Sequence, residues 1–195
     1  TASWGNMGQN DFGREPREPM PNQSSYYWSY VFEGNWQDSY AAISAASDGI
    51  RAIEAGLEIG PGGERNPRAT VFAKFNVGMA LCYLGMWYDK AFIVNETTDV
   101  TSGLEFASYD AVMSAALAKL GEVITEASST PFTLQEEWMP STNGALSNTD
   151  LANLAKSYRA RCATNGPRSE AEAASVDWST VRTDATDGMQ ELTIV

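Results

Sequence analysis

Apolar residues recur at steps of three and four in five segments of this chain, and that spacing constrains its fold more than any other feature. Residues one helical turn apart lie on one face, so each segment predicts an amphipathic helix. We expect Asn35 to cap the first helix, with Asp38 near its positive end. Its apolar face comprises Trp36, Tyr40, Ile43, Ile50, Ile53 and Leu57. Residues 60–67 (GPGGERNP) end this helix, because Gly and Pro interrupt helical hydrogen bonding.

The second helix carries the longest apolar stretch of the sequence, residues 77–88. A membrane-spanning helix needs about 20 such residues, so we predict a buried core helix and no transmembrane segment. We expect its buried stripe at Phe72, Phe75, Met79, Tyr83 and Met86. Other apolar residues, Val77, Leu81, Leu84 and Trp87, occupy its remaining faces. The second helix is therefore expected to be central and packed nearly all round.

The third helix has the most regular apolar stripe of the five. It is expected to start at the cap Ser108 and to run to about residue 128. Its stripe comprises Tyr109, Val112, Ala116, Leu120, Val123 and Ala127. Residues 129–145 follow with prolines, a glycine and no helical period, which predicts a surface loop.

Two further helices complete the pattern. Ser147 and Asp150 form a capping-box sequence at the start of the fourth helix, which residues 165–167 (NGP) end. Its apolar positions are Leu151, Leu154, Ala155, Tyr158 and Cys162. Asp177 is expected to cap the last helix, with Val176 and Val181 as a hydrophobic staple. Trp178, Val181 and Ala185 are expected to face inward, and Gly188 to end the helix.

Five such helices joined by turns and loops predict an all-α fold of helix pairs stacked on one another. Residues 1–33 are rich in Gly, Asn, Pro and charge, which predicts a long irregular N-terminal arm before a helical domain over residues 34–190. Residues 192–195 are apolar and end without a turn, so we expect truncation there. Cys82 and Cys162 lie on separate helices. They form one long-range disulfide or are two buried thiols, and we favour the thiols.

Composition excludes several classes of function. With 13 Lys and Arg against 25 Asp and Glu, the net charge of −12 repels a phosphate backbone, so we expect no nucleic-acid partner. The sequence has no histidine, which removes the commonest general base and the commonest zinc ligand. We therefore expect no catalytic residue, no metal and no cofactor.

Aromatic residues supply the candidate contact surface, which comprises Tyr26, Tyr27, Trp28 and Trp138. Adjacent side chains of an extended segment point to opposite sides, so Tyr26, Tyr27 and Trp28 cannot all face inward. The three either pack onto the helices as core or form a surface for sugar rings or a protein partner. Trp138, in a polar loop, has the same two interpretations.

In order along the chain, five segments resemble the SusD/RagB family of outer-membrane nutrient-binding lipoproteins. The lead-in WGNMG…GREPREPMPN is similar to the start of many members, and NWQDSYAAISAASDGIRAIE resembles their first tetratricopeptide-like helix. RATVFAKFNVGMALCYLGMWYDKAFIV resembles the aromatic-rich second helix, and SYDAVMSAALAKLGEVI and LANLAKSYRARCAT resemble helices that follow it. VDWSTVRTDA is similar to the Asp-Trp start of the next helix.

The resemblance implies a non-catalytic binding protein of the bacterial cell envelope, in the periplasm or on the outer-membrane surface. Such a protein presents a glycan or other nutrient to a β-barrel transporter. Members are longer than this chain, which starts at Thr1, so we expect a preceding segment that could carry a lipid anchor. The alternative is a scaffold subunit docked on a larger membrane complex of transport, respiration or photosynthesis.

Overall fold

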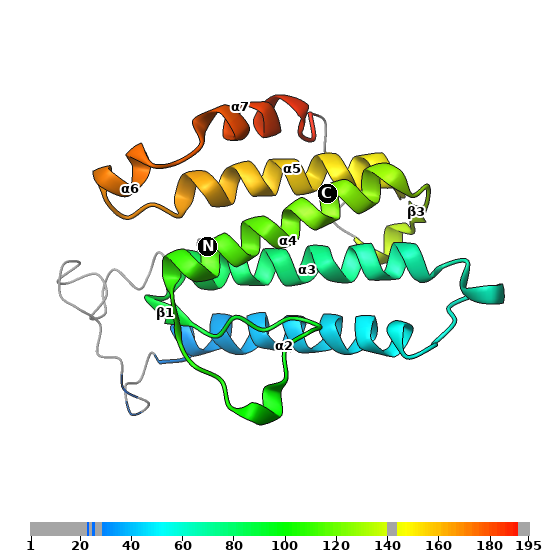
Figure 1. Ribbon diagram of the computed structural model, residues 1–195, viewed down its shortest axis with the longest axis horizontal. Helices are drawn as coiled ribbons and strands as arrows, with labels where there is room; N and C mark the ends of the chain where they lie inside the picture. The colour runs from blue at the N-terminus through cyan, green and yellow to red at the C-terminus, as the bar shows by residue number, and fades with distance from the viewer. Residues whose placement is uncertain (1–22, 24, 26–28, 140–143, 191–195) are drawn as a thin grey trace, which may run out of the picture. The chain divides into compact units, whose positions relative to one another are not determined.

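The computed structural model describes residues 23, 25, 29–139 and 144–190, apart from the side chains of residues 31 and 32. The chain divides into two compact units, Thr1–Gln37 and Asp38–Val195, and each is described by itself. In the described residues the elements of regular structure are mostly helical (Figure 1), which confirms the all-α class. The α-helices are α2 (Tyr30–Glu54), α3 (Asn66–Trp87), α4 (Tyr109–Ser129), α5 (Asn148–Asn165), α6 (Glu170–Ala174) and α7 (Trp178–Asp187).

The short elements lie in the connections. Three single turns of 3₁₀ helix are η2 (Pro61–Gly63), η3 (Val100–Ser102) and η4 (Glu136–Trp138). Two antiparallel ladders pair β1 (Lys90–Ala91) with β2 (Ala107–Ser108) and β3 (Thr133–Leu134) with β4 (Leu146–Ser147). Each ladder closes the base of a loop, so that the loop leaves and re-enters the helical body at one place.

α2 begins earlier than its sequence predicts. Its first residue is Tyr30, so the predicted cap Asn35 lies inside the helix and the boundary expected after residue 33 falls within it. Glu33 is the acidic residue of its first turn, where the positive end of the helix dipole stabilises a negative charge. The expected apolar face is correct at the fully buried Ile43 and Ile50. It is wrong at Leu57, which lies beyond the helix end and is 51% exposed.

The turn between α2 and α3 is where the sequence predicts it. Three of its glycines have positive φ: Gly60, Gly62 and Gly63. Asn66 then begins α3, and its side-chain oxygen accepts a hydrogen bond of 2.7 Å from the backbone amide of Ile59. Pro67 follows in the first turn of the helix, where a missing amide hydrogen costs nothing.

α3 is the central helix, and α4 is its closest neighbour. The face it turns to α4 carries two glycines, two helical turns apart. A Cβ atom on Gly85 would lie 3.2 Å from backbone atoms of Tyr109 and Met113, and one on Gly78 would lie 3.0 Å from the Leu120 side chain. The two helices therefore approach almost backbone to backbone, which side chains at these positions would prevent.

The predicted stripe of α3 is partly wrong for the same reason. Phe72, Met79, Tyr83 and Met86 are only half-buried, whereas Phe75 is buried as expected. The most buried side chains are Val71, Val77, Leu81, Cys82 and Leu84. The buried face includes the two glycines, which contribute nothing to an apolar sequence pattern. Trp87, expected on another packed face of the helix, is 53% exposed.

α3 is also long and apolar enough to cross a membrane, and it is the one helix of the described residues that is. Half of its most apolar window is buried by packing within the protein. Length and composition alone are weak evidence for a membrane span, and half of the window is covered by the protein itself.

We predict that Gly85→Ala destabilises the protein, although alanine favours a helix over glycine by about 1 kcal/mol. The added methyl group meets backbone that cannot rotate away, and such overpacking costs about 1–3 kcal/mol. Gly49→Ala in α2 is the control, because no atom lies within 4 Å of its Cβ position and only the helix preference acts. Urea unfolding should lower the midpoint for the first variant and raise it for the second; a stabilised Gly85→Ala would contradict the close contact.

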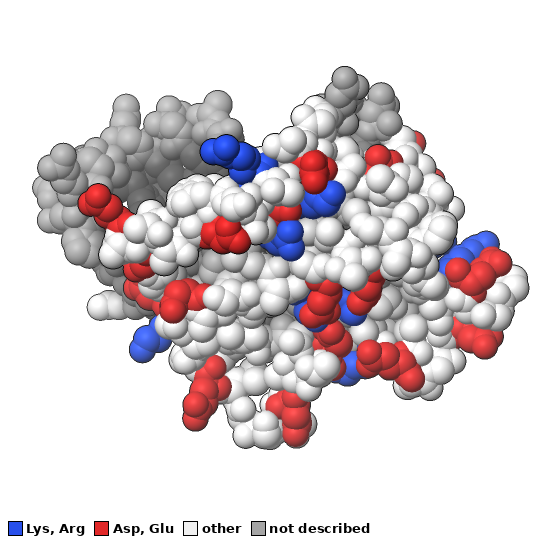
Figure 2. Space-filling view, turned by 45° about the horizontal axis from the view of Figure 1, so that its top comes forward, with Lys and Arg blue, Asp and Glu red and all other residues white. Residues whose placement is uncertain are grey.

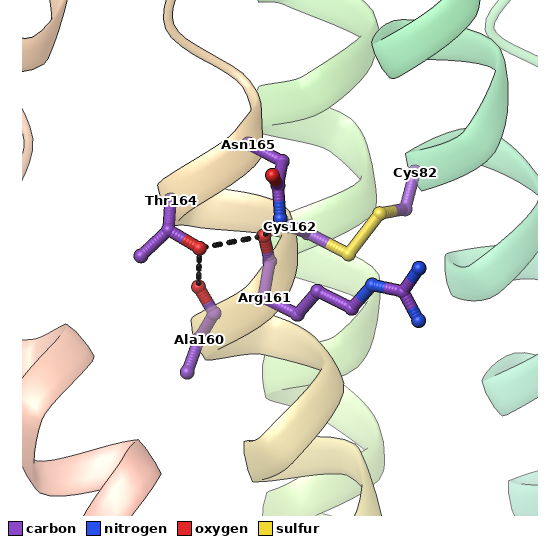
Figure 3. Close-up of a disulfide and its surroundings, with 6 residues drawn as sticks. All are labelled: Cys82, Ala160, Arg161, Cys162, Thr164 and Asn165. Carbon is purple, nitrogen blue, oxygen red and sulfur yellow. Dashed lines mark hydrogen bonds between the residues drawn. A yellow bond between two sulfur atoms is a disulfide. The ribbon is translucent and has the colours of Figure 1, made fainter.

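Cys82 of α3 and Cys162 of α5 form a disulfide, with their Cα atoms 5.9 Å apart (Figure 3). Our expectation of free thiols is therefore wrong, while the expected burial of both residues is correct. α5 packs on α3 as well as on α4, which brings together residues 80 positions apart in the sequence. Sequence spacing alone could not show that contact.

Reduction of this disulfide should lower the free energy of unfolding substantially. A cross-link that closes a loop of 80 residues restricts the unfolded chain, and the chain-entropy model gives about 4–5 kcal/mol for it. Guanidinium unfolding with and without a thiol reductant measures the change. A variant with Cys82→Ala and Cys162→Ala is the control, since the reductant should not shift its midpoint. An equal midpoint for oxidised and reduced protein would contradict the prediction.

α4 and α5 agree well with their predicted patterns. Ser108 occupies the N-cap position of α4, and every residue of the predicted stripe is buried except the half-buried Tyr109. α5 starts with the predicted capping box, in which the Ser147 hydroxyl accepts from the amide of Asp150 at 3.1 Å and the Asp150 carboxylate accepts from the amide of Ser147 at 2.9 Å. α5 ends at Asn165, as predicted.

The segment α6–α7 differs more from the pattern that the sequence predicts. Asp177 caps α7 as predicted, and its carboxylate accepts from the amides of Ser179 and Thr180. Trp178 is 49% exposed and Ala185 is exposed, so two of the three residues expected to face inward do not. The buried residue of α7 is Asp184. The short helix α6 was not predicted.

Candidate functional site

The aromatic residues that the sequence singles out do not come together in the described structure. Tyr26, Tyr27 and Trp28 lie outside the described residues. Trp138, at the end of η4, is half-buried against α3. Its ring lies 5.4 Å from that of Phe72, and the guanidinium of Arg68 lies 5.1 Å from its centre. Trp138 therefore packs against the protein's own helix.

A hollow in the described structure lies between α4 and the segment α6–α7, with α5 beneath it. We call it the α4–α7 cleft; its volume is about 620 Å³. Sites for small molecules commonly measure about 300–1,000 Å³. Aliphatic side chains form much of its wall: Met113, Leu117, Ala163, Val176 and Val181.

One end of the cleft is held by Arg168, in the connection between α5 and α6. Its guanidinium donates hydrogen bonds to the carbonyl oxygens of Gly85 (3.2 Å) and Tyr88 (2.8 Å), at the C-terminal end of α3. It also pairs with the carboxylate of Asp89 and lies 3.9 Å over the ring of Tyr109. A cation is favourable at the negative end of a helix, so these contacts fix the start of the α6–α7 segment.

The other end is held from α5. The Arg159 guanidinium donates two hydrogen bonds, of 2.5 Å and 2.7 Å, to the carboxylate of Asp184, which is 3% exposed. The backbone amide of Met189 donates to the Ser157 hydroxyl at 2.8 Å. These bonds attach α7 to α5 and set the width of the cleft at this end.

Sequence reasoning missed this ion pair. Asp177, Val181 and Asp184 follow one another at steps of four and three, so an acidic residue stands on the inner face of α7. A buried carboxylate needs a partner, and α5 supplies Arg159 on the neighbouring face. An acidic residue at position 184 of this otherwise apolar face was the feature of the sequence that could have revealed the ion pair.

Three carboxylates surround the cleft from three different elements: Asp110 from α4, Glu172 from α6 and Asp177 from the cap of α7. A hydrogen bond from the Ser108 hydroxyl lowers the pKa of Asp110. The Arg168 amide, which donates at 2.7 Å, lowers that of Glu172. A 2.6 Å bond from the Thr180 hydroxyl lowers the pKa of Asp177. All three therefore keep their negative charge into mildly acidic solution.

The neighbouring tyrosine responds in the opposite sense. The Tyr109 hydroxyl donates a hydrogen bond to the Glu172 carboxylate, and this bond, with the negative charge of Glu172, raises the pKa of Tyr109 because both disfavour a phenolate. Tyr109 is therefore neutral at physiological pH, and its one hydroxyl proton is already donated to Glu172.

A second group of charges lies elsewhere, between α3, α4 and the loop after β1. The Lys119 ammonium pairs with Glu96 (2.8 Å) and Glu122 (2.9 Å), and Lys74 pairs with Glu126 (2.5 Å). Burial acts to raise the pKa of Glu96, but the hydrogen bond from Lys119 outweighs it and the pKa is lowered. Ammonium groups thus occupy the space between these carboxylates. No cluster of three His, Cys, Asp or Glu side chains among the described residues could hold a metal ion.

The α4–α7 cleft is thus an aliphatic wall beside fixed negative charge. Such an arrangement is suited to binding. No protein-family model, curated protein or solved structure matches this chain.

We predict that breaking the Arg159–Asp184 pair is costly. Arg159→Met leaves a buried carboxylate unpaired, and removal of one partner of such a pair costs about 3–5 kcal/mol. The double variant with Asp184→Leu should recover part of that loss, because no charge is left unpaired. Urea unfolding of the two single variants and the double variant measures the coupling.

The exposed pair Arg51–Asp48 is the matched comparison, with side chains 36% and 68% exposed. Arg51→Met and Asp48→Asn should show a coupling below about 1 kcal/mol. Equal coupling for the two pairs would show that burial does not determine the strength of the Arg159–Asp184 bond.

Proposed function

We propose that this protein is a non-catalytic, SusD-like binding protein of the bacterial cell envelope that presents a glycan or other nutrient to a partner transporter. The observation that carries the proposal is the α4–α7 cleft, whose volume of about 620 Å³ suits a small oligomeric ligand. The resemblance of five segments, in order, to the SusD/RagB family supports it further.

The disulfide supports the proposed location in the cell envelope. Bonds of this kind form and persist in secreted and periplasmic proteins and are rare where cytosolic reductants act. Cys82 and Cys162 are 1% and 0% exposed and join two core helices, which is the position of a structural bond. An envelope location follows naturally from a chain that depends on such a bond.

The cleft can be tested by filling it. Ala118 of α4 is an exposed cleft residue, so Ala118→Trp adds a large side chain there without disturbing the core. Calorimetry with a panel of oligosaccharides and oligopeptides should find a ligand for the unchanged protein. Its affinity should fall by about tenfold or more in the filled variant, equivalent to about 1.4 kcal/mol. Ala185→Trp, on exposed α7 and outside the lining, should leave the affinity unchanged. A ligand that both variants bind equally would exclude the cleft as its site.

The second candidate is a scaffold subunit on a larger membrane complex, and one surface favours it. Trp87, near the end of α3, is 53% exposed, and its ring lies 5.7 Å from that of Tyr83. The Arg161 guanidinium of α5 lies 5.9 Å from the centre of the Tyr83 ring. Exposed tryptophan with arginine is typical of contacts between proteins.

The two candidate functions depend on different surfaces: nutrient binding on the α4–α7 cleft, and scaffolding on the surface around Trp87. Co-purification from native membranes with Trp87→Arg and with Ala118→Trp separates them. A nutrient-presenting protein should be recovered with a barrel transporter and should lose ligand binding with Ala118→Trp. A scaffold subunit should be recovered with another membrane complex, lose that complex with Trp87→Arg, and show no ligand for the cleft.

A further inference from the structure

The cleft carries an excess of negative charge. Among its charged lining residues, Asp110, Glu172, Asp177 and Asp184 are acidic and Arg159 is basic, an excess of three negative charges. Arg159 and Asp184 neutralise each other through two hydrogen bonds. The three remaining carboxylates therefore act on whatever enters the cleft.

The guanidinium of Arg168 lies over the ring of the lining residue Tyr109, but its charge is paired with that of Asp89. Arg168 is not among the residues that line the cleft, and its guanidinium is paired with Asp89 and with carbonyl oxygens of α3. Figure 2 brings the α6–α7 side forward and shows acidic and basic side chains scattered over it with uncharged surface between them. The excess charge is thus a property of the cleft lining, in which three carboxylates come from three elements.

The walls do not favour a neutral sugar. Sugar rings are usually held on the flat face of an aromatic side chain, and Tyr109 is the one aromatic residue among the described lining. The guanidinium of Arg168 lies 3.9 Å from the centre of its ring and covers one face. Three hydroxyl donors of the lining are also engaged, since Thr180 donates to Asp177, Ser175 to the Glu172 carbonyl and Tyr109 to the Glu172 carboxylate.

What remains is aliphatic wall and negative charge, which suits a ligand with aliphatic side chains beside a cation. We propose that the α4–α7 cleft binds a short basic oligopeptide in which Lys or Arg stands next to aliphatic residues. The aliphatic side chains would cover Leu117, Val176 and Val181, and the cation would face Asp110 and Glu172. This assignment rests on the proposed function and specifies its nutrient as peptide.

The test uses three tripeptides blocked at both ends: Leu-Lys-Leu, Leu-Gln-Leu and Leu-Glu-Leu. Calorimetry at low salt should rank them in that order, with Leu-Lys-Leu bound about tenfold or more tighter than Leu-Glu-Leu. Raising the salt should weaken Leu-Lys-Leu most, because surface charges are screened. Equal binding of the three peptides would overturn the inference.

Asp110→Lys is the informative variant, because Asp110 is exposed and its substitution leaves the anchors of the cleft intact. The affinity for Leu-Lys-Leu should fall about fivefold or more, and Leu-Glu-Leu should gain. Asp187→Lys, on α7 outside the lining, changes the net charge equally and should have little effect. An equal loss in both variants would show attraction by net charge alone and would overturn the inference.

The remaining outcomes separate this inference from the proposed function. A neutral oligosaccharide that binds, and is displaced by Ala118→Trp while the peptides do not bind, overturns the peptide assignment and leaves a nutrient-binding cleft. No binding by any peptide or oligosaccharide overturns both.

Discussion

The near contact of the α3 and α4 backbones at Gly78 and Gly85 is the constraint on which the rest of the structure depends. Two helices that approach so closely leave little freedom in their crossing, so the groove they offer to the next helix is fixed. α5 packs on both and is bonded to α3 through Cys82–Cys162. α7 then packs on α5, so each layer is positioned by the one before it.

The α4–α7 cleft is a consequence of how the last layer is attached. The α6–α7 segment is held at one end by Arg168 on the end of α3 and at the other by the Arg159–Asp184 pair. Both anchors are charge-assisted hydrogen bonds, which are stronger and more directional than neutral ones. Between them the segment spans α5 without filling the space beside α4. Polar contacts thus leave open a hollow that apolar packing would have tended to close.

The periodic part of the fold could be predicted from the sequence, and the contacts between distant segments could not. The stripe of α4 and the capping box at Ser147 are local patterns, and both are present in the structure. The burial of α3 was predicted less well, because its tightest contact is made by glycines that carry no apolar signal. The disulfide and the Arg159–Asp184 pair join helices distant in sequence, so the cleft depends on information that no single segment contains.

The cross-link between α3 and α5 also bears on how the chain reaches its native state. Cys82 and Cys162 are the two cysteines of the sequence, so only one intramolecular pairing exists and no wrong one can be formed within it. Within these residues the bond needs an oxidant but no isomerase, since there is no second pairing to reshuffle. In a chain synthesised from its N-terminus, Cys162 appears only after α4. Cys82 therefore has no partner thiol until α5 has followed. During that interval the unpaired thiol of Cys82 is open to reaction with other thiols.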